Sequence, residues 1–168
     1  WDHAEANPFS SSTGNWGGAI DWIVRVIQTS LSAKTQGVAA VADAQRQAPI
    51  DGPVVISTDP PYYDNINYAD LSDFFYVWQK RALPRGTALR DPFDIENVLT
   101  PKAAEIVEDE TKLVDGCPKD RHFFEQRMAQ AFASARRILK DDAIGSVVFA
   151  HKTTEGWEAL LGGIMRAK

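Results

Sequence analysis

The sequence predicts an α/β protein with a mostly parallel sheet flanked by helices. Short apolar runs alternate with longer segments whose apolar residues recur at helical spacing, and this alternation is typical of strand–helix–strand units. The balance of 44% hydrophobic and 24% charged residues is that of an ordinary globular chain. With 168 residues, the chain is long enough for one domain with a core of its own.

The first predicted element is a helix that follows a turn-rich loop over residues 7–18, "NPFSSSTGNWGG". Its apolar residues share one face at helical spacing: Ile20, Ile23, Val24, Ile27 and Leu31. We expect Gly37 just past the end of this helix, where a left-handed backbone favours glycine. The run "GVAAVADA", residues 37–44, then predicts a short buried strand that ends at Asp43.

A second strand, "PVVIST", is predicted from Pro53 to Thr58, and a helix is predicted from Ala69 to Ala82. The helix carries a stripe at helical spacing, formed by Leu71, Phe74, Phe75, Trp78 and Ala82. That spacing favours core packing over base stacking for the aromatic residues, and only Tyr76 lies off the stripe. Residues 84–118 contain several prolines without a firm period, which indicates a long connection.

The last part of the chain predicts a helix, a strand and a helix. The first helix runs from Asp120 to Lys140 with the apolar face Phe124, Met128, Ala131, Phe132, Ala135, Ile138 and Leu139. The run "AIGSVVFAH", residues 143–151, predicts a strand that is buried on both sides. The final helical stripe consists of Trp157, Leu160, Leu161, Ile164 and Met165. Because ligands bind beyond the carboxyl ends of parallel strands, we expect Asp43, Asp59 and His151 at one rim.

Composition excludes several classes of protein. The formal net charge of −5 argues against a general polyanion binder, although a locally basic groove stays open. Cys117 is the only cysteine, so an intrachain disulfide and a cysteine-rich zinc site are excluded, and we predict no metal. No apolar run is long enough to span a membrane, and the first residues lack the features of a signal peptide. These observations predict a cytoplasmic protein with no membrane partner.

The stretch "VVISTDPPYYDNINY", residues 54–68, carries the chemistry. Asp59 follows a strand, and Pro60 and Pro61 have fixed φ angles and no N–H donor, so the corner is stiff. Its carbonyl groups have few local donors, and Tyr62 offers a flat ring beside them. Two acceptors next to an aromatic ring suit a planar group with an NH2, such as the amino edge of a nucleobase. Plain turn formation is the alternative interpretation of the same residues.

"DPPY" at a strand end resembles the signature of S-adenosylmethionine-dependent amino-methyltransferases, which modify adenine N6 or cytosine N4 in DNA. The likeness extends to the adenine-specific DNA methylase family described by a domain of unknown function and a zinc ribbon. Four segments carry it: "AEANPFSSSTGNW", "TDPPYYDNINYADLSDFFYVW", "TPKAAEIV" and "VVFAHKTTEGWEALL". The resemblance covers most of the chain and implies a partial Rossmann-like methyltransferase sheet, mostly parallel.

The resemblance also implies roles for single residues. The Asp59 carboxylate and the Pro60 carbonyl would accept the N–H groups of the amine, Pro61 would complete the rigid corner, and Tyr62 would stack on a flipped-out base. Residues of the following loop would line the base or cofactor pocket: Tyr63, Asp64, Asn65 and Tyr68. Asp43 would lie near the adenine of S-adenosylmethionine, or it would only cap the segment "DAQRQ". His151 and Lys152 would reach a phosphate or the rim of the site, or would be ordinary surface residues.

Parts of such an enzyme are not recognisable in the chain. The glycine-rich turn that holds the methionine portion of the cofactor, the last two strands and the zinc ribbon have no counterpart. We therefore expect residues 1–168 to form a single, incomplete catalytic methyltransferase domain, inactive by itself and a weak binder of S-adenosylmethionine. Its partners would be DNA, the missing parts of the parent methylase and, through exposed sheet edges, a second copy. An RNA base methyltransferase, a non-catalytic nucleic-acid-binding fragment and a scaffold for partner proteins are the alternatives.

Overall fold

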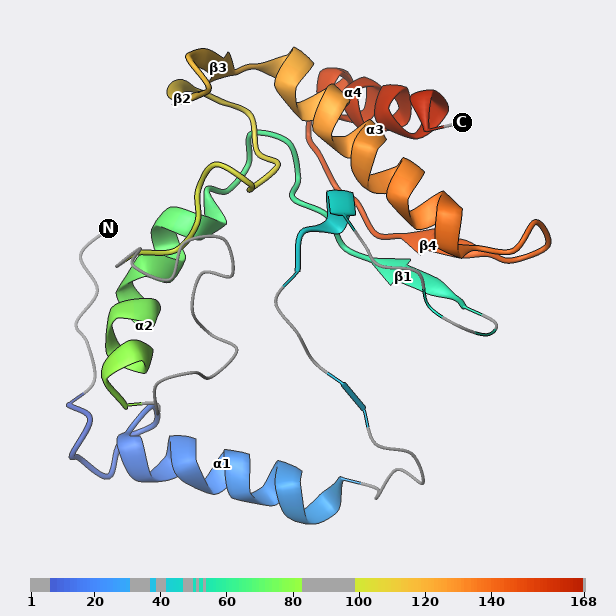
Figure 1. Ribbon diagram of the computed structural model, residues 1–168. Coiled ribbons are helices and arrows are strands. Elements are labelled where there is room, and N and C mark those ends of the chain that lie inside the picture. Colours follow the sequence, from blue (N-terminus) through green and yellow to red (C-terminus); the bar gives the residue numbers. More distant parts are fainter. Residues whose placement is uncertain are drawn as a thin grey trace. The chain divides into compact units, whose positions relative to one another are not determined.

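A computed structural model describes residues 7–30, 37–38, 42–46, 50, 52, 54–82 and 99–167 (Figure 1). The chain divides into two compact units, Trp1–Ala39 and Ala40–Lys168. The described residues are mixed α/β, with four α-helices, one short 3-10 helix and two small sheets. The predicted α/β class is therefore confirmed, whereas a full Rossmann-like methyltransferase sheet is not formed by these residues.

The main described element of the first unit is the helix α1, Trp16–Thr29. Asn15 starts it, because its side-chain oxygen accepts the Gly18 N–H at 2.7 Å. The helix ends earlier than predicted. Ser30 has an extended backbone, and its N–H and hydroxyl both donate to the Val26 carbonyl. Gly37 has no left-handed φ and does not cap the helix, and Leu31 lies outside the described residues.

The parallel pair of strands in the second unit is shorter than the sequence predicts. Strand β1, Ile56–Thr58, pairs with β4, Gly145–Val147, so that Ile56 lies opposite Gly145. All three β4 residues are exposed, and the prediction of a strand buried on both sides is wrong. The reason is that burial of both faces requires helices on both sides and further strands. In the described part of the chain, β4 has β1 as its one strand neighbour.

Two further predictions about strands are also wrong. The described residues of the expected strand 37–44 are not in a strand, and Ala44–Arg46 form the 3-10 helix η1. The expected connection 84–118 contains a hairpin, with β2 at Asp109–Val114 and β3 at Cys117–Lys119. The turn residues Asp115 and Gly116 have φ angles of 53° and 80°. An Asp-Gly pair with positive φ at both positions is the usual two-residue hairpin turn, and the sequence contains that signal in "VDGC".

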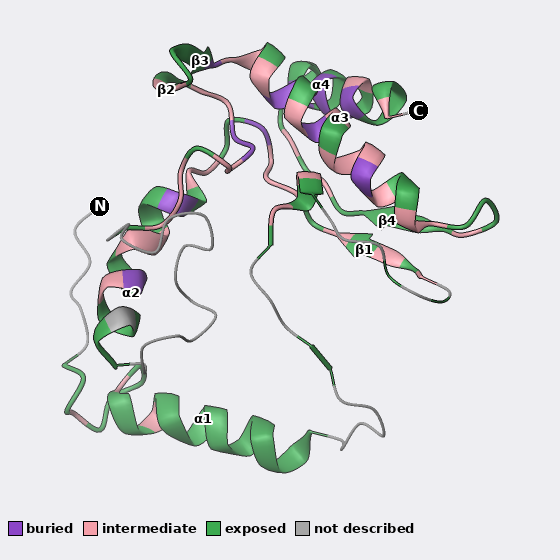
Figure 2. Cartoon of the chain, viewed as in Figure 1, coloured by how far each residue is buried: buried purple, intermediate pink, exposed green. Residues whose placement is uncertain are grey.

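The helix α2, Tyr68–Ala82, confirms the predicted helix but not its predicted buried face. The stripe residues Leu71, Phe74, Phe75 and Trp78 are all exposed, whereas Ala69 and Tyr76 are buried (Figure 2). The buried side of α2 is determined by the segment of the chain that packs against the helix. The segment 99–102 is hydrogen-bonded to Asp73, on another side of α2, so the polar side is the one that is covered.

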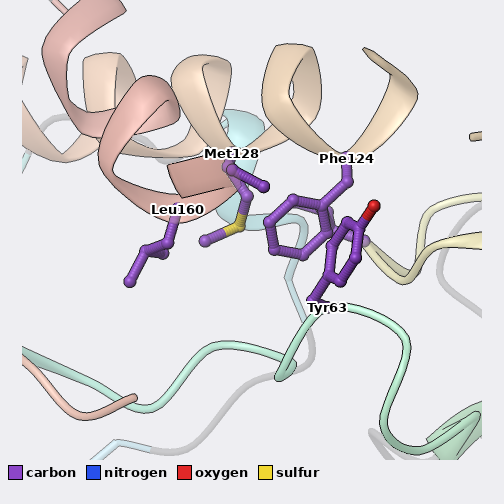
Figure 3. Packing of buried hydrophobic residues seen from close by; sticks show 6 residues of the cluster. Tyr63, Phe124, Met128 and Leu160 are labelled. Carbon is purple, nitrogen blue, oxygen red and sulfur yellow. The ribbon is translucent and has the colours of Figure 1, made fainter. Parts of the chain in front are cut away.

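The hydrophobic core lies between the helices α3, Arg121–Ile138, and α4, Thr154–Arg166. Asp120 caps α3 by accepting the Phe123 N–H, and Thr153 caps α4 by accepting the Gly156 N–H. Both helices agree with the sequence prediction. Of the predicted face of α3, Phe124 and Met128 are buried and the other residues are half-buried, and Glu125 and Ser134 are buried although they were not predicted. Of the predicted α4 stripe only Leu160 is buried. The core cluster joins the two helices to two loop residues, and its members are Tyr63, Ile106, Phe124, Met128, Ala159 and Leu160 (Figure 3).

Candidate functional site

The corner at Asp59 stands at the carboxyl end of β1, as the sequence predicts. The Thr58 carbonyl accepts the Val148 N–H at 2.9 Å, so the strand pair holds the chain up to the corner itself. Asp59 is exposed, and the ion pairs formed within the described ranges do not include it. The Tyr62 hydroxyl donates a hydrogen bond to Asp59, and this bond is the main cause of the raised pKa of Tyr62. The carboxylate is therefore held by its neighbour and still open to a ligand.

A cavity of about 390 Å³ lies in front of this corner. Its wall consists of Asp59, Pro60, Pro61, Tyr62, Tyr68 and Glu105. A second, mostly apolar cavity of about 430 Å³ touches the corner as well and extends to α3, with Met128, Ala131 and Phe132 in its wall. The two prolines thus separate a polar, aromatic pocket from an apolar one. We call the first of these the Asp59 cavity.

The adjacent tyrosines Tyr62 and Tyr63 point to different places. Tyr63 has a left-handed backbone, with a φ angle of 59°. This conformation is unfavourable for any residue other than glycine, and it occurs where the surrounding structure enforces it. Its ring packs edge-on against Phe124, with centroids 5.1 Å apart (Figure 3). Its carbonyl accepts the Glu108 N–H at 3.2 Å. Burial, with the charges of Glu155 and Glu108, raises the pKa of Tyr63 to about 12.

This arrangement assigns different roles to the two rings. Tyr63 is 6% exposed and lies in the core, and the wall of the Asp59 cavity does not include it. A contact of Tyr63 with a base or cofactor stays a prediction. Tyr62 is half-buried, lines the Asp59 cavity and meets Phe149 edge-on at 5.3 Å. The buried ring of Tyr63 anchors the loop, and the left-handed turn leaves Tyr62 at the cavity.

Asp64 and Asn65 lie on another hollow of about 530 Å³, together with Tyr62, His151 and Lys152. Asp64 Oδ1 lies 2.8 Å from His151 Nε2. Because His151 Nδ1 accepts the Thr153 N–H at 3.2 Å, the proton of the neutral ring belongs on Nε2, which donates to Asp64. His151 therefore connects the start of α4 to the loop after the diproline corner.

Gly156 makes room for this histidine. A Cβ atom at position 156 would lie 2.3 Å from His151 Nδ1, a distance that no side chain tolerates without movement. Asp59 and His151 follow the paired strands β1 and β4, as predicted for the rim. Asp43, the third residue of that prediction, follows no strand in the described residues and precedes η1. His151 acts on the loop through Asp64, which the sequence alone does not reveal.

Asp43 caps the segment that follows it, which is the second of the two roles predicted for this residue. Its Oδ1 accepts the Gln45 N–H at 2.9 Å and the Gln45 side-chain amide at 3.1 Å. Gln45 in turn accepts a hydrogen bond from Arg127 of α3 at 3.0 Å. The neighbouring Ala44 lines the apolar cavity that reaches Asp59. Asp43 thus fixes η1 beside that cavity, and a contact with a cofactor stays a prediction.

Sequence reasoning missed one wall of the Asp59 cavity. The segment after Leu99 is bound to α2: Thr100 and Lys102 donate to Asp73 at 2.8 Å and 2.6 Å, and Glu105 Oε1 accepts the Ala69 N–H at 2.9 Å. These contacts bring Glu105 into the cavity wall next to Tyr68. The sequence signal for this segment is the polar residues Thr100, Lys102 and Glu105 within "TPKAAEIV".

Comparisons with known proteins add nothing to this geometry. No protein-family model matches the chain, and no curated protein or solved structure matches it either. Over the ranges that the structure describes, no group of three or more His, Cys, Asp or Glu side chains is placed to hold a metal ion. No helix in those ranges has the length and apolarity needed to cross a membrane.

Proposed function

We propose that the Asp59 cavity binds the exocyclic amine of a nucleobase for methylation, with adenine N6 of DNA as the first choice and cytosine N4 as the second. One observation carries the proposal. An exposed carboxylate without an ion pair in the described ranges stands at a strand end, beside a diproline corner and in a cavity lined by Tyr62 and Tyr68. The "DPPY" motif and its resemblance to amino-methyltransferases supply the reaction type.

The corner offers acceptors to an amine that is a poor nucleophile. The lone pair of such an amine is delocalised into the ring of the base. Hydrogen bonds from its N–H groups to the Asp59 carboxylate and the Pro60 carbonyl favour a pyramidal nitrogen, whose lone pair is then free to attack. Positive charge builds on the nitrogen as the new bond forms, and fixed acceptors stabilise that charge where it develops. Holding the nitrogen in place supplies a further part of the rate enhancement.

The tyrosines of the cavity suit a base that has left the helical stack. An enzyme that modifies a base in a duplex must flip it out, and the flipped base needs a stacking partner. Tyr62 and Tyr68 line the cavity, and stacking on one aromatic ring contributes about 1–3 kcal/mol per base. Because the Tyr62 hydroxyl is hydrogen-bonded to Asp59, the ring of Tyr62 and the Asp59 carboxylate are positioned together.

In this proposal the described residues around Asp59 supply the amine-binding part of the site. S-adenosylmethionine, which the resemblance implies, would supply an electrophilic methyl group. Asp43 is the residue predicted to contact it, but one carboxylate oxygen of Asp43 is already occupied by Gln45 and the other lies 3.8 Å from Arg46. We therefore expect weak binding of S-adenosylmethionine by this chain.

The test is methyl transfer by the full-length protein to matched DNA and RNA oligonucleotides that contain adenine or cytosine. Asp59→Ala should lower the rate at least ~100-fold, the loss typical of removing one group that stabilises developing charge, while DNA binding falls little. Asp142→Ala, at an exposed position, is the matched control and should keep the wild-type rate. Equal activity of the Asp59→Ala variant would refute the proposal, and transfer to RNA alone would replace DNA as the substrate.

A further inference from the structure

His151 has a nearly buried side chain whose two ring nitrogens both have partners. The side chain is 7% exposed. Its Nε2 lies 2.8 Å from Asp64 Oδ1, and its Nδ1 accepts the Thr153 N–H at 3.2 Å. The His151 carbonyl also accepts the indole N–H of Trp157 at 3.1 Å. One residue therefore joins the loop after the diproline corner to the start of α4.

The imidazole ring of His151 belongs to a group of aromatic rings that ends at the Asp59 cavity. It stacks on Phe149, with centroids 6.3 Å apart, and meets the Tyr63 ring edge-on at 5.7 Å. Phe149 in turn meets Tyr62 edge-on at 5.3 Å, and Tyr62 lines the cavity. The ring of Tyr62 is thus linked to His151 through Phe149.

The backbone of the loop gives a second link between the same two residues. Tyr62 and Asp64 belong to one tight turn, because the Tyr62 carbonyl accepts the Asn65 N–H at 3.1 Å. The turn contains the left-handed residue Tyr63, and such a conformation persists only where surrounding contacts hold it. The packing of the Tyr63 ring is one of these contacts, and the hydrogen bond between His151 and Asp64 is another. A shift of Asp64 would therefore turn the Tyr62 ring as well.

Core packing explains the buried ring of His151 but not its bond to Asp64. The Asp64 side chain is 52% exposed, and a polar contact to such a partner adds little to the stability of a whole protein. We infer that His151 is a positioning residue for the Asp59 cavity. By donating its Nε2 proton to Asp64, it fixes the turn 62–65 and with it the Tyr62 ring on which the base stacks. The inference rests on the proposed function.

The test compares two amide substitutions of His151 by NMR titration of the chain with adenosine. A glutamine amide reaches about as far as Nε2, so His151→Gln keeps a donor for Asp64. The shorter asparagine amide reaches only as far as Nδ1, so His151→Asn loses that donor. Since both variants lack the imidazole ring, their difference reports on the bond to Asp64. His151→Gln should bind adenosine about fivefold or more tightly than His151→Asn, the lower limit of what stacking on one aromatic ring contributes.

Two further substitutions complete this test. Asp64→Ala should weaken the binding of adenosine as His151→Asn does. In the Asp64→Ala background the two His151 substitutions should bind adenosine equally, because the bond that distinguishes them is gone. His122→Asn, at an exposed position of α3, is the control and should bind adenosine like the wild type. A merely structural role of His151 would lower the affinity and the unfolding midpoint of both His151 variants alike.

A readout without adenosine separates this inference from the proposed function. The contact between the Tyr62 and Phe149 rings should give a nuclear Overhauser effect that remains in His151→Gln and is lost in His151→Asn. If the two variants bind adenosine equally well, or if the ring contact responds to both in the same way, the role of His151 is wrong and the proposed function stands. If the wild type does not bind adenosine, the proposed function is wrong, and the ring contact alone decides whether His151 positions Tyr62.

Discussion

The helices of the second unit follow two different rules of burial. On α3 the apolar residues that meet α4 are buried, with Phe124 at 0% and Met128 at 2% exposure. On α4 the side that meets α3 is buried at Ala159 and Leu160, whereas Trp157, Leu161, Ile164 and Met165 are exposed. On α2 the apolar face is open, with Phe74 at 68% and Trp78 at 61% exposure (Figure 2). All three helices have apolar residues at helical spacing. The difference teaches that the spacing defines a face, whereas a partner element decides whether that face is buried.

The partners explain the contrast. Helix α3 meets α4 so closely that a Cβ atom on Gly163 would lie 2.9 Å from Met128 Cβ. The covered side of α2 is polar instead: Asp73 accepts from Thr100 and Lys102, and Asp70 pairs with Lys112. Helix α2 is therefore positioned by hydrogen bonds and ion pairs, and these contacts place Tyr68 and Glu105 at the Asp59 cavity.

The largest expected effect is at the centre of the covered core. Phe124→Ala removes a ring that packs against Tyr63 and should reduce the free energy of unfolding by about 3–5 kcal/mol. Because Tyr63 anchors the loop after the diproline corner, nucleoside binding should weaken as well. Chemical denaturation measures the loss of stability, and an NMR titration with adenosine measures the loss of binding. A loss of less than about 1 kcal/mol would show that this cluster is not the core of the fold.

The close approach of α3 and α4 gives a matched pair of glycine variants. Gly163→Ala places a methyl group 2.9 Å from Met128 Cβ and should cost about 1–3 kcal/mol of stability. At Gly162 the nearest atom to an added Cβ is Glu125 Cδ at 3.8 Å, an ordinary contact. Gly162→Ala should therefore leave stability unchanged or raise it by up to about 1 kcal/mol through helix propensity. Thermal unfolding of the pair tests the contrast, and equal midpoints would contradict it.

The stability that the polar side of α2 contributes should depend on pH, because it includes the Asp73 carboxylate. Burial works to raise the pKa of Asp73, but hydrogen bonds from Lys102 and Thr100 outweigh it and lower that pKa from 3.8 to about 2. A lowered pKa in the folded state means that the unfolded chain binds the proton more tightly. The contribution of Asp73 is therefore complete above about pH 4 and is lost as the pH falls through about 2.

Asp73→Asn should remove this pH dependence and cost about 1–2 kcal/mol of stability at pH 7, since charge-assisted hydrogen bonds are replaced by neutral ones. Denaturation curves at pH 7, 4 and 2.5 measure it. Asp115→Asn, at a turn position that tolerates asparagine, is the control and should leave the pH profile unaltered. A variant that keeps the acid sensitivity of the wild type would show that Asp73 does not bind the segment to α2.

The parts of this fold that the sequence predicted are local. All four helices were expected because apolar spacing acts within a few positions. The caps that the structure shows at Asn15 and Asp120 are equally local. The strands were less well predicted, since β1 and β4 have three residues each and their burial depends on neighbours that are distant in the chain. The hairpin was missed although the Asp115–Gly116 turn has a local signal, because the prolines before it suggested a long loop.

The candidate site divides in the same way. The Asp59 corner was predicted because one short motif contains all its parts. The contact of His151 with Asp64 joins residues 87 positions apart, and that of Glu105 with Ala69 joins residues 36 positions apart. Neither pair has a sequence pattern of its own. A single sequence locates the motif, and the residues that the fold brings to it become known only from three-dimensional contacts.

The smallest expected effect is on the open face of α2, and it tests the comparison most directly. Phe74→Ser and Phe75→Ser change exposed side chains and should alter the free energy of unfolding by no more than about 0.5 kcal/mol. They should nevertheless reduce the binding of an apolar dye, because these rings are part of the exposed apolar surface. Tyr76→Ser, at a buried position of the same helix, should be clearly destabilising. If the Phe variants were as destabilising as the Tyr76 variant, the aromatic stripe would be buried in solution and α2 would obey the same rule as α3.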